Sequence, residues 1–157
     1  LMRYVLYEAN KSQISLEREI QFLENYIALM KLRYTERLTI CTDFPIIVPR
    51  VQIPPLLFIS LLENAFKHGI SPTNHSFIHI SLTEKDGQVN CVIRNSNYPK
   101  NENDKSGSGI GLEQVRKRLE LLYAGRYEWH QQISSNQKEY SSILTIKIPD
   151  NNKKILP

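Results

Sequence analysis

The apolar residues of the chain first recur with helical spacing between residues 16 and 34. They stand four and three residues apart in alternation: Leu16, Ile20, Leu23, Ile27, Met30 and Tyr34. This spacing places them on one face of an α-helix, with Ser15 as a suitable N-cap and Glu17 and Glu19 in the first turn. Because such a repeat usually packs on another helix, we expect a helix pair or a dimer seam. The alternative is an amphipathic helix lying on its own domain.

The rest of the chain alternates between strand-like and helix-like patterns. Pro54 and Pro55 pre-set the first turn of a strongly apolar helix that ends at Gly69. A further helix is expected from residue 109 or 110 to 123. Period-two runs predict strands over residues 38–44, 77–84, 88–94, 127–133 and 141–148, and Asp86-Gly87 is a good hairpin turn. The polar stretch 95–108 is long for a loop inside a domain, which is typical of a functional or mobile segment.

This order of elements predicts an α+β fold. We expect a two-layer α/β sandwich in which helices cover one face of a mixed, mostly antiparallel sheet, preceded by a helical segment. The 157 residues are 41% hydrophobic and 23% charged, which excludes disordered, collagen-like and purely coiled-coil chains. No apolar run approaches the roughly 20 residues that span a bilayer. Because the first residue is Leu1, we expect the chain to be a piece of a longer protein.

Charge and cysteine content narrow the possible partners. The formal net charge is +4, but the basic residues are scattered and no stripe interleaves them with aromatic residues, so we expect no nucleic-acid partner. Cys41 and Cys91 lie in strand-like runs, which predicts small buried thiols in a reducing compartment. The four histidines show no zinc-ligand spacing with these cysteines.

The apolar helix that follows Pro54 and Pro55 ends in a polar cluster, Glu63-Asn64-Ala65-Phe66-Lys67-His68-Gly69. Polar side chains on a buried helix are costly unless something pairs with them. The amide oxygen of Asn64 is a hard ligand suited to Mg²⁺, and Lys67 on the same helix face can meet a phosphate. The alternative is that Asn64 is a buried structural amide.

A glycine-rich junction, Gly107-Ser108-Gly109-Ile110-Gly111-Leu112, joins the polar stretch to the last helix. Glycines let a backbone approach a phosphate closely, and a helix N-terminus offers free N–H groups. The G-x-G-x-G spacing is neither a dinucleotide-binding fingerprint nor a Walker A loop. The alternative is a glycine hinge that binds no ligand.

Taken together, the two clusters in this order resemble the N, G1 and G2 boxes of one ATP-binding fold. That fold is shared by sensor histidine kinases, the gyrase B subunit, Hsp90 chaperones and MutL repair proteins. The match is best with the sensor histidine kinases whose response regulators often carry LytTR-type domains. It rests on Arg3-Tyr4 and on residues 16–34, 53–69 and 107–123.

The resemblance implies ATP and Mg²⁺ as ligands and assigns the residues that hold them. Asn64 would hold the metal, and Glu63 would assist or orient as the only residue here with a catalytic part. The remaining nucleotide contacts implied are Lys67, His68, Asn95, Gly107, Gly109, Gly111 and Leu112. Asn95 stands where many relatives have an aspartate that accepts from the adenine amino group, and Asn97 stands where glycine is common. Residues 95–108 would form the ATP lid.

The resemblance also implies a protein-histidine kinase rather than an ATPase. Ser60, one helical turn before Asn64, stands where the gyrase-like relatives have a glutamate that activates water. Residues 1–38 would then be the remnant of a helical dimerisation and phosphoacceptor region, 39–150 the catalytic ATP-binding domain and 151–157 a polar tail. The phosphoacceptor histidine would lie upstream, so the chain alone should not autophosphorylate.

The implied partners are a second copy, bound through the N-terminal helical region, and a response regulator of LytTR type. The full-length protein would be anchored in the bacterial inner membrane with this part on the cytoplasmic face. Two alternatives remain. One is a degenerate nucleotide-sensing or protein-interaction module, suggested by Asn95 and Asn97, and the other is an anti-sigma serine kinase of the same fold.

Overall fold

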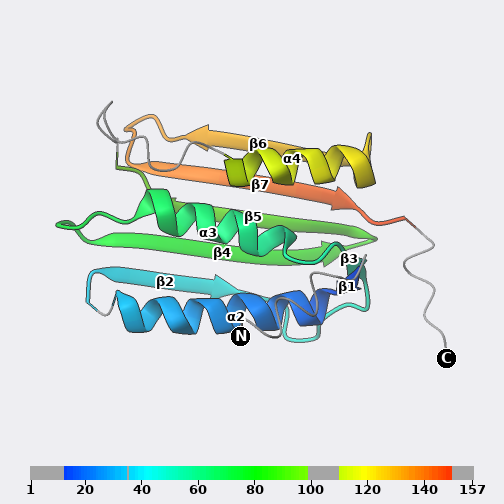
Figure 1. Cartoon of the computed structure of the whole chain (residues 1–157), viewed down its shortest axis with the longest axis horizontal. Helices are drawn as coiled ribbons and strands as arrows, with labels where there is room; N and C mark the ends of the chain where they lie inside the picture. The colour runs from blue at the N-terminus through cyan, green and yellow to red at the C-terminus, as the bar shows by residue number, and fades with distance from the viewer. Residues whose placement is uncertain (1–12, 35, 99–109, 150–157) are drawn as a thin grey trace.

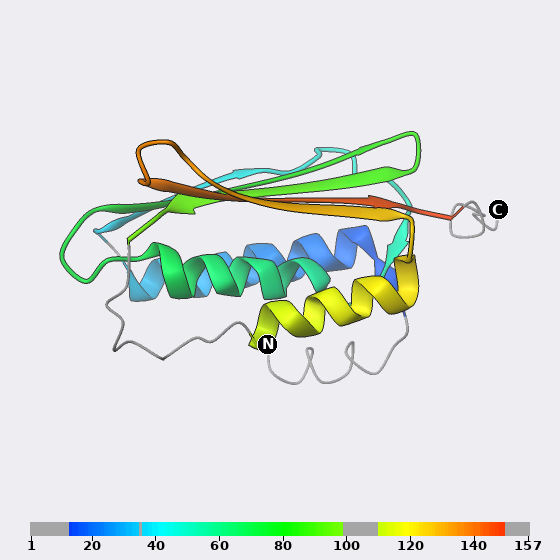
Figure 2. The same cartoon turned by 90° about the horizontal axis from the view of Figure 1, so that it is seen from above.

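The computed structural model describes residues 13–34, 36–98 and 110–149, which form two layers. One layer is a five-stranded sheet of order β2-β4-β5-β7-β6, and the other consists of the helices α2, α3 and α4 (Figure 1). Seen from above, all three helices lie on the same face of the sheet (Figure 2). The predicted fold class is therefore confirmed.

The sheet is mixed in the way the sequence predicts. The edge strand β2 (Leu38–Asp43) runs parallel to β4 (Ser76–Lys85), and the other neighbours are antiparallel. The remaining strands are β5 (Gln88–Ser96), β6 (Tyr127–Ile133) and β7 (Glu139–Lys147). Asp86 and Gly87 join β4 to β5 with φ values of 53° and 82°, the left-handed pair that a tight hairpin needs.

The core lies between the sheet and the helices. Alternate residues of the central strands are buried there, among them Ile78, Ile80, Leu82, Val89, Cys91, Ile93, Leu144 and Ile146. Cys91 is buried as predicted, but the prediction for Cys41 is wrong because its thiol is exposed. On the edge strand β2, Leu38 and Ile40 face the core, so the strand's two-residue period turns Cys41 outward.

Helix α2 (Leu16–Arg33) begins where the sequence predicts. The Ser15 side chain accepts a hydrogen bond from the Arg18 backbone N–H at 3.2 Å, which caps the helix. Just before it, the short strand β1 (Ile14–Ser15) pairs with β3 (Gln52–Ile53), two strands that the sequence did not indicate. This ladder anchors the start of α2 to the segment that leads into α3.

The predicted apolar seam of α2 packs inside the described unit. Leu16, Ile20, Leu23 and Ile27 are buried in the same core as the sheet, and α2 contacts both α3 and β2. This packing corresponds to the alternative of a helix lying on its own domain. The division of the chain into functional regions at residue 38 stays a prediction. The first twelve residues of the predicted N-terminal region, 1–38, lie outside the described part of the chain.

Helix α3 (Leu57–Gly69) starts two residues after Pro55, later than the prolines suggest. Leu56, in the N-cap position, has a left-handed φ of 62° and offers no side-chain cap. Helix α4 (Ile110–Tyr123) closes the helical layer beside α3. Most of the predicted lid, together with Gly107 and Gly109, lies outside the described residues. Within the described ranges, no helix has the length and apolar character needed to cross a membrane.

Candidate functional site

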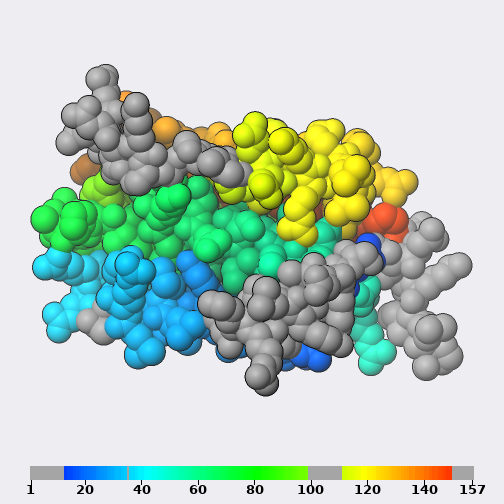
Figure 3. Space-filling model, viewed as in Figure 1, coloured from blue at the N-terminus to red at the C-terminus, as the bar shows by residue number. Residues whose placement is uncertain are grey.

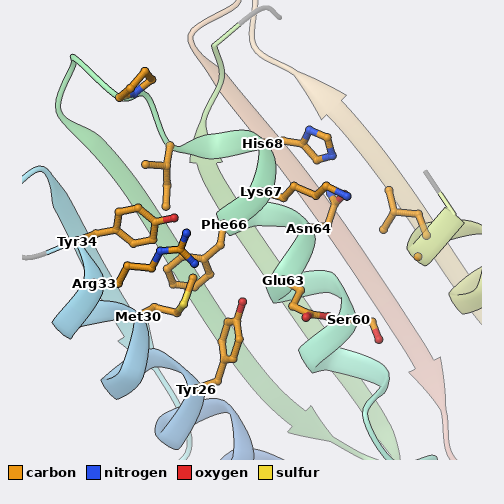
Figure 4. Close-up of a pocket in the computed structure, with 14 residues that line it drawn as sticks. Tyr26, Met30, Arg33, Tyr34, Ser60, Glu63, Asn64, Phe66, Lys67 and His68 are labelled. Carbon is orange, nitrogen blue, oxygen red and sulfur yellow. The ribbon is translucent and has the colours of Figure 1, made fainter. Parts of the chain in front are cut away.

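A cavity of about 620 Å³ opens on the helical layer, between α2, α3 and the start of α4. The three helices lie side by side on the face shown in Figure 3. Six lining residues come from α3, and the others flank it (Figure 4). We therefore describe the cavity as a groove whose floor is α3 and whose walls are α2 and α4.

The floor is a polar stripe along α3, which we define as Ser60, Glu63, Asn64, Lys67 and His68. These positions recur at three- and four-residue intervals and share one face of the helix. The opposite face carries the buried Leu61, Leu62 and Ala65, while Phe66 lies between that face and the α2 wall. Burial of the apolar face in the core thus turns the stripe toward the groove.

The stripe contains four residues that the sequence proposed for the site, Glu63, Asn64, Lys67 and His68. Glu63 and Lys67 are exposed, whereas Asn64 and His68 are half-buried. The predicted reading of Asn64 as a fully buried structural amide is thus not what the structure shows. Ser60 lies one turn before Asn64, and its hydroxyl donates to the backbone oxygen of Leu56 at 2.9 Å.

Gly111 and Leu112 form the α4 wall, across the groove from α2. They bring the glycine-rich motif to the same cavity as the polar stripe, although the two motifs are far apart in the sequence. A Cβ added at Gly111 would meet no atom within 4 Å, so open space adjoins this backbone. Of the predicted site, these two residues are the part of the glycine-rich junction that the structure describes.

The α2 wall was not predicted as part of any site. It consists of Tyr26, Met30, Arg33 and Tyr34. Tyr26 meets the ring of Phe66 edge-on, with centroids 5.4 Å apart at 83°. Burial raises the pKa of Tyr26 to about 12, nearby Glu63 and Tyr34 add to that rise, and Arg33 opposes it. The signal in the sequence was the helical seam itself, whose last two members, Met30 and Tyr34, face the groove.

Asn95 lies beneath the end of α3 rather than on the groove wall. It is 2% exposed, and its Nδ2 donates to the Ser96 backbone oxygen at 2.9 Å. A Cβ added at Gly69 would stand 2.8 Å from that nitrogen, so only glycine lets the helix end so close to β5. Asn97, two residues further along the chain, donates from its side-chain amide to the backbone oxygen of Gln137 at 2.9 Å. The predicted role of Asn95 toward adenine stays a prediction.

A buried carboxylate that sequence reasoning missed holds the start of α3. Glu19 of α2 is fully buried, and its two oxygens accept the backbone N–H groups of Leu56 and Phe58, each at 3.0 Å. It thereby caps α3 in place of the side chain that Leu56 cannot supply. Burial raises the pKa of Glu19 to about 7, against the lowering effect of these N–H groups and of Arg118.

Arg118 extends this cap to the third helix. Its Nη2 donates to the backbone oxygen of Pro55 at 2.5 Å, immediately before α3. One carboxylate from α2 and one guanidinium from α4 therefore fix the N-terminal end of the helix that forms the groove floor. The signal available in the sequence was the position of Glu19, an acid on the seam between Leu16 and Leu23.

The donor chemistry of the floor restricts what it can hold. In the part of the chain that the structure describes, no three His, Cys, Asp or Glu side chains gather closely enough to enclose a metal ion. A cation at Asn64 would meet one amide oxygen and would take its other ligands from a bound phosphate and water. Mg²⁺ binds in this way, with few protein oxygens. The groove thus fits a phosphate-bearing ligand that brings its metal with it.

The known proteins that this chain resembles are histidine kinases and sensor proteins. A family model described as histidine kinase matches residues 1–38. The sensor histidine kinase YpdA of Escherichia coli is 32% identical over 131 residues, which is 78% of this chain and 23% of that protein. The sensor protein LytS of Oceanobacillus iheyensis is 25% identical over 169 residues, covering 99% of this chain and 28% of that protein.

Solved structures agree on the fold. The catalytic domain of the histidine kinase ThkA matches with a TM-score of 0.63 at 18% identity, covering 89% of this chain and 97% of that domain. The histidine kinase domain of a blue-light activated kinase from Erythrobacter litoralis matches with a TM-score of 0.61 at 16% identity, covering 85% of this chain and 62% of that one. The chain spans about a quarter of the length of the curated relatives named above.

Proposed function

Because this chain belongs to the sensor histidine kinases, we propose that it binds ATP with Mg²⁺ in the groove and serves phosphoryl transfer to a histidine. Catalytic domains of histidine kinases bind ATP, generally with Mg²⁺. The observation that carries the proposal is the meeting of two motifs in one cavity. The polar stripe of α3 and the glycine-rich start of α4 are separate in sequence, yet both line it.

Each polar group of the floor then has a role that its chemistry supports. The Asn64 amide oxygen offers a ligand to Mg²⁺, which neutralises phosphate charge when bound. Lys67 supplies a positive charge to the phosphates, and His68 lies beside it on the same stripe. The Glu63 carboxylate, exposed at the groove, can orient an incoming imidazole by accepting its N–H.

Ser60 supports transfer to a histidine rather than to water. Its hydroxyl has no useful basicity near neutral pH, and it is already engaged with the Leu56 backbone oxygen. In the proposed reaction, the bond between the γ-phosphorus and the bridging oxygen of ATP breaks, and a phosphorus–nitrogen bond to the imidazole forms. ADP and phosphohistidine result, and the imidazole proton passes to solvent.

The acceptor and the partners of this reaction belong to the same proposal. We place the acceptor histidine upstream of Arg3, with residues 1–38 in the helical region through which two copies pair. The partner would be a response regulator of LytTR type, as the resemblance of residues 53–69 to that branch supports. The whole protein would be held at the bacterial inner membrane with this domain on the cytoplasmic side.

Calorimetric titration with a non-hydrolysable ATP analogue, with and without Mg²⁺, tests the proposal. We expect metal-dependent binding that weakens roughly tenfold or more in Asn64→Ala, because the variant lacks the one protein oxygen for the metal. Asn25→Ala is the matched control, since Asn25 is an exposed amide on α2 outside the groove. Affinity without metal dependence would instead favour the alternative of a degenerate nucleotide-sensing module.

A second measurement addresses the chemistry. We expect negligible ATP hydrolysis, and no label on the chain from γ-labelled ATP, because none of its four histidines lies in a phosphoacceptor context. A metal-dependent turnover that Asn64→Ala abolishes would refute the proposed absence of a water-activating base.

A further inference from the structure

One aromatic side chain beside the helical layer has no part in the function proposed above. Tyr140, the second residue of β7, lies on the face of the sheet that the helices cover, as do the buried Leu144 and Ile146 further along the strand. On that face Tyr127 and Trp129 pack against the core of described residues, whereas Tyr140 is not part of that packing. Its side chain is half-buried, and burial raises the pKa of its hydroxyl with no hydrogen bond or charge of the described residues adding to the rise. Core packing therefore leaves this ring available to a ligand.

Tyr140 lies directly beside Asn95, the proposed adenine contact. The two residues are cross-strand partners of β7 and β5, and side chains so paired on one face start about 5 Å apart. On its other side Asn95 is paired with Ile78, which is completely buried, and Gly69 at the end of α3 covers it. The side of Asn95 toward Tyr140 is therefore the one from which a ligand can approach.

The described helices leave this part of the sheet open. In both views β7 begins beside the end of α3 and beyond the first turn of α4 (Figures 1 and 2). Ile133 of β6, the cross-strand partner of Tyr140 on its other side, is 55% exposed. Tyr140 and Ile133 thus form a small apolar surface next to Asn95, between the end of α3 and the start of α4.

The polar stripe faces the same side of α3. The side chains of Asn64, Lys67 and His68 point away from α2 and toward α4 (Figure 4). A nucleotide whose phosphates meet these side chains lies between α3 and α4. Because Asn95 lies under Gly69, the last residue of α3, a base that reaches Asn95 lies past the His68 end of the stripe and over Tyr140.

We propose that Tyr140 stacks on the purine base of the nucleotide while Asn95 meets the edge of that base, and that this stacking makes the site prefer a purine to a pyrimidine nucleotide. This inference rests on the proposed function. Aromatic side chains bind nucleic-acid bases by stacking on their faces. A purine has two fused rings and a pyrimidine has one, so the purine covers more of the surface that Tyr140 and Ile133 expose.

The test compares two bases on the full 157-residue chain. Dissociation constants of non-hydrolysable ATP and UTP analogues, each with Mg²⁺, are measured by calorimetry for the unaltered chain and for Tyr140→Ala, Tyr140→Phe and Tyr127→Ala. Binding of the ATP analogue is also measured without Mg²⁺. Tyr127 is the matched control, because it is a half-buried tyrosine on the same face but at the other end of the sheet, where its hydroxyl donates to Glu120. Melting curves by circular dichroism verify that each variant is folded.

We expect Tyr140→Ala to weaken binding of the ATP analogue roughly tenfold, as for loss of a stacked base, and to weaken binding of the UTP analogue less than about threefold. Tyr140→Phe should keep the affinity for the ATP analogue, because it keeps the ring, and Tyr127→Ala should change neither nucleotide. The factor by which Mg²⁺ strengthens binding of the ATP analogue should be the same in Tyr140→Ala as in the unaltered chain, because the ring contacts the base and not the metal.

The outcomes separate this inference from the proposed function. If the unaltered chain binds the ATP analogue in a metal-dependent manner, then an equal loss for both nucleotides, no loss for either, or tighter binding in Tyr140→Ala overturns the role of Tyr140 alone. A loss in Tyr140→Phe as large as in Tyr140→Ala also overturns it, since the ring would then not be the part that binds. An unaltered chain that binds neither nucleotide overturns the proposed function and this inference with it.

Discussion

Replacing Glu19 with alanine probes how the groove floor is held in place. The side chain of Glu19 caps α3 from outside that helix, by accepting the backbone N–H groups of Leu56 and Phe58 at 3.0 Å each. Alanine leaves both donors without this acceptor, in a buried position for Phe58 and a partly buried one for Leu56. Each unsatisfied buried donor costs about 1–3 kcal/mol, so the variant should lose about 2–6 kcal/mol of unfolding free energy. The free energy of unfolding of a whole domain is only about 5–15 kcal/mol, so this loss would be a large part of it.

Leu56 adds to this cost. Its left-handed φ of 62° is unfavourable for a residue with a Cβ by about 1–2 kcal/mol, and the hydrogen bond to Glu19 helps to hold it there. Without the carboxylate we expect the start of α3 to fray. The polar stripe would then be less well positioned, so nucleotide affinity should fall along with stability.

Urea unfolding followed by circular dichroism measures the loss, with Glu17→Ala as the matched control. Glu17 lies in the same first turn of α2 but is exposed and makes none of the described hydrogen bonds to α3. The midpoint for Glu19→Ala should fall far below that of the control. If the two variants unfold with the same free energy, the carboxylate does not cap α3 and the reasoning is wrong.

Three further predictions concern pH, packing and thiol exposure. Burial raises the pKa of Glu19 from 4.5 to about 7, so the folded state binds the proton of this carboxyl more tightly than the unfolded state does. The contribution of Glu19 to the free energy of unfolding should therefore fall by up to about 3 kcal/mol as the pH rises from about 4.5 to 7. Glu19→Gln should flatten that part of a profile of urea stability against pH. Gly69→Ala should lower the melting temperature by the equivalent of about 1–3 kcal/mol, because the added Cβ would stand 2.8 Å from Nδ2 of Asn95. Gly111→Ala is the control and should show no such steric loss, because its Cβ would meet no atom within 4 Å. A thiol reagent should modify one cysteine of the native chain, because Cys91 is buried and burial raises the pKa of its thiol. Cys41→Ser should abolish that reaction. Rapid reaction at both cysteines in the folded chain would contradict the packing of β5.

The elements of the fold could be predicted because each depends on local patterns. The spacing of Leu16, Ile20, Leu23 and Ile27 specifies a helix whatever it packs against, and the period of two in β4 and β5 specifies strands. Asp86-Gly87 specifies the tight turn between them, because both positions need a left-handed backbone. The two short strands β1 and β3 were missed, since two residues are too few to show a period.

The floor of the candidate site was also accessible from the sequence. Glu63, Asn64, Lys67 and His68 are polar residues at helical spacing on a helix that is otherwise apolar, which is unusual unless that face is used. Their meeting with Gly111 and Leu112 could be inferred from the resemblance to a family. The residues alone left open whether the two motifs share a site.

The sequence by itself determined the helices, the five strands of the main sheet, the fold class and the chemically distinctive residues, because these depend on periods and side-chain types within one segment. The tertiary structure decided what each residue faces. It made Glu19 a cap for α3, turned Cys41 outward on an edge strand, set Asn95 beneath Gly69 and brought Arg33 to the groove. Each of these depends on which element lies alongside, and that is settled only when the helices and the sheet pack around a common core.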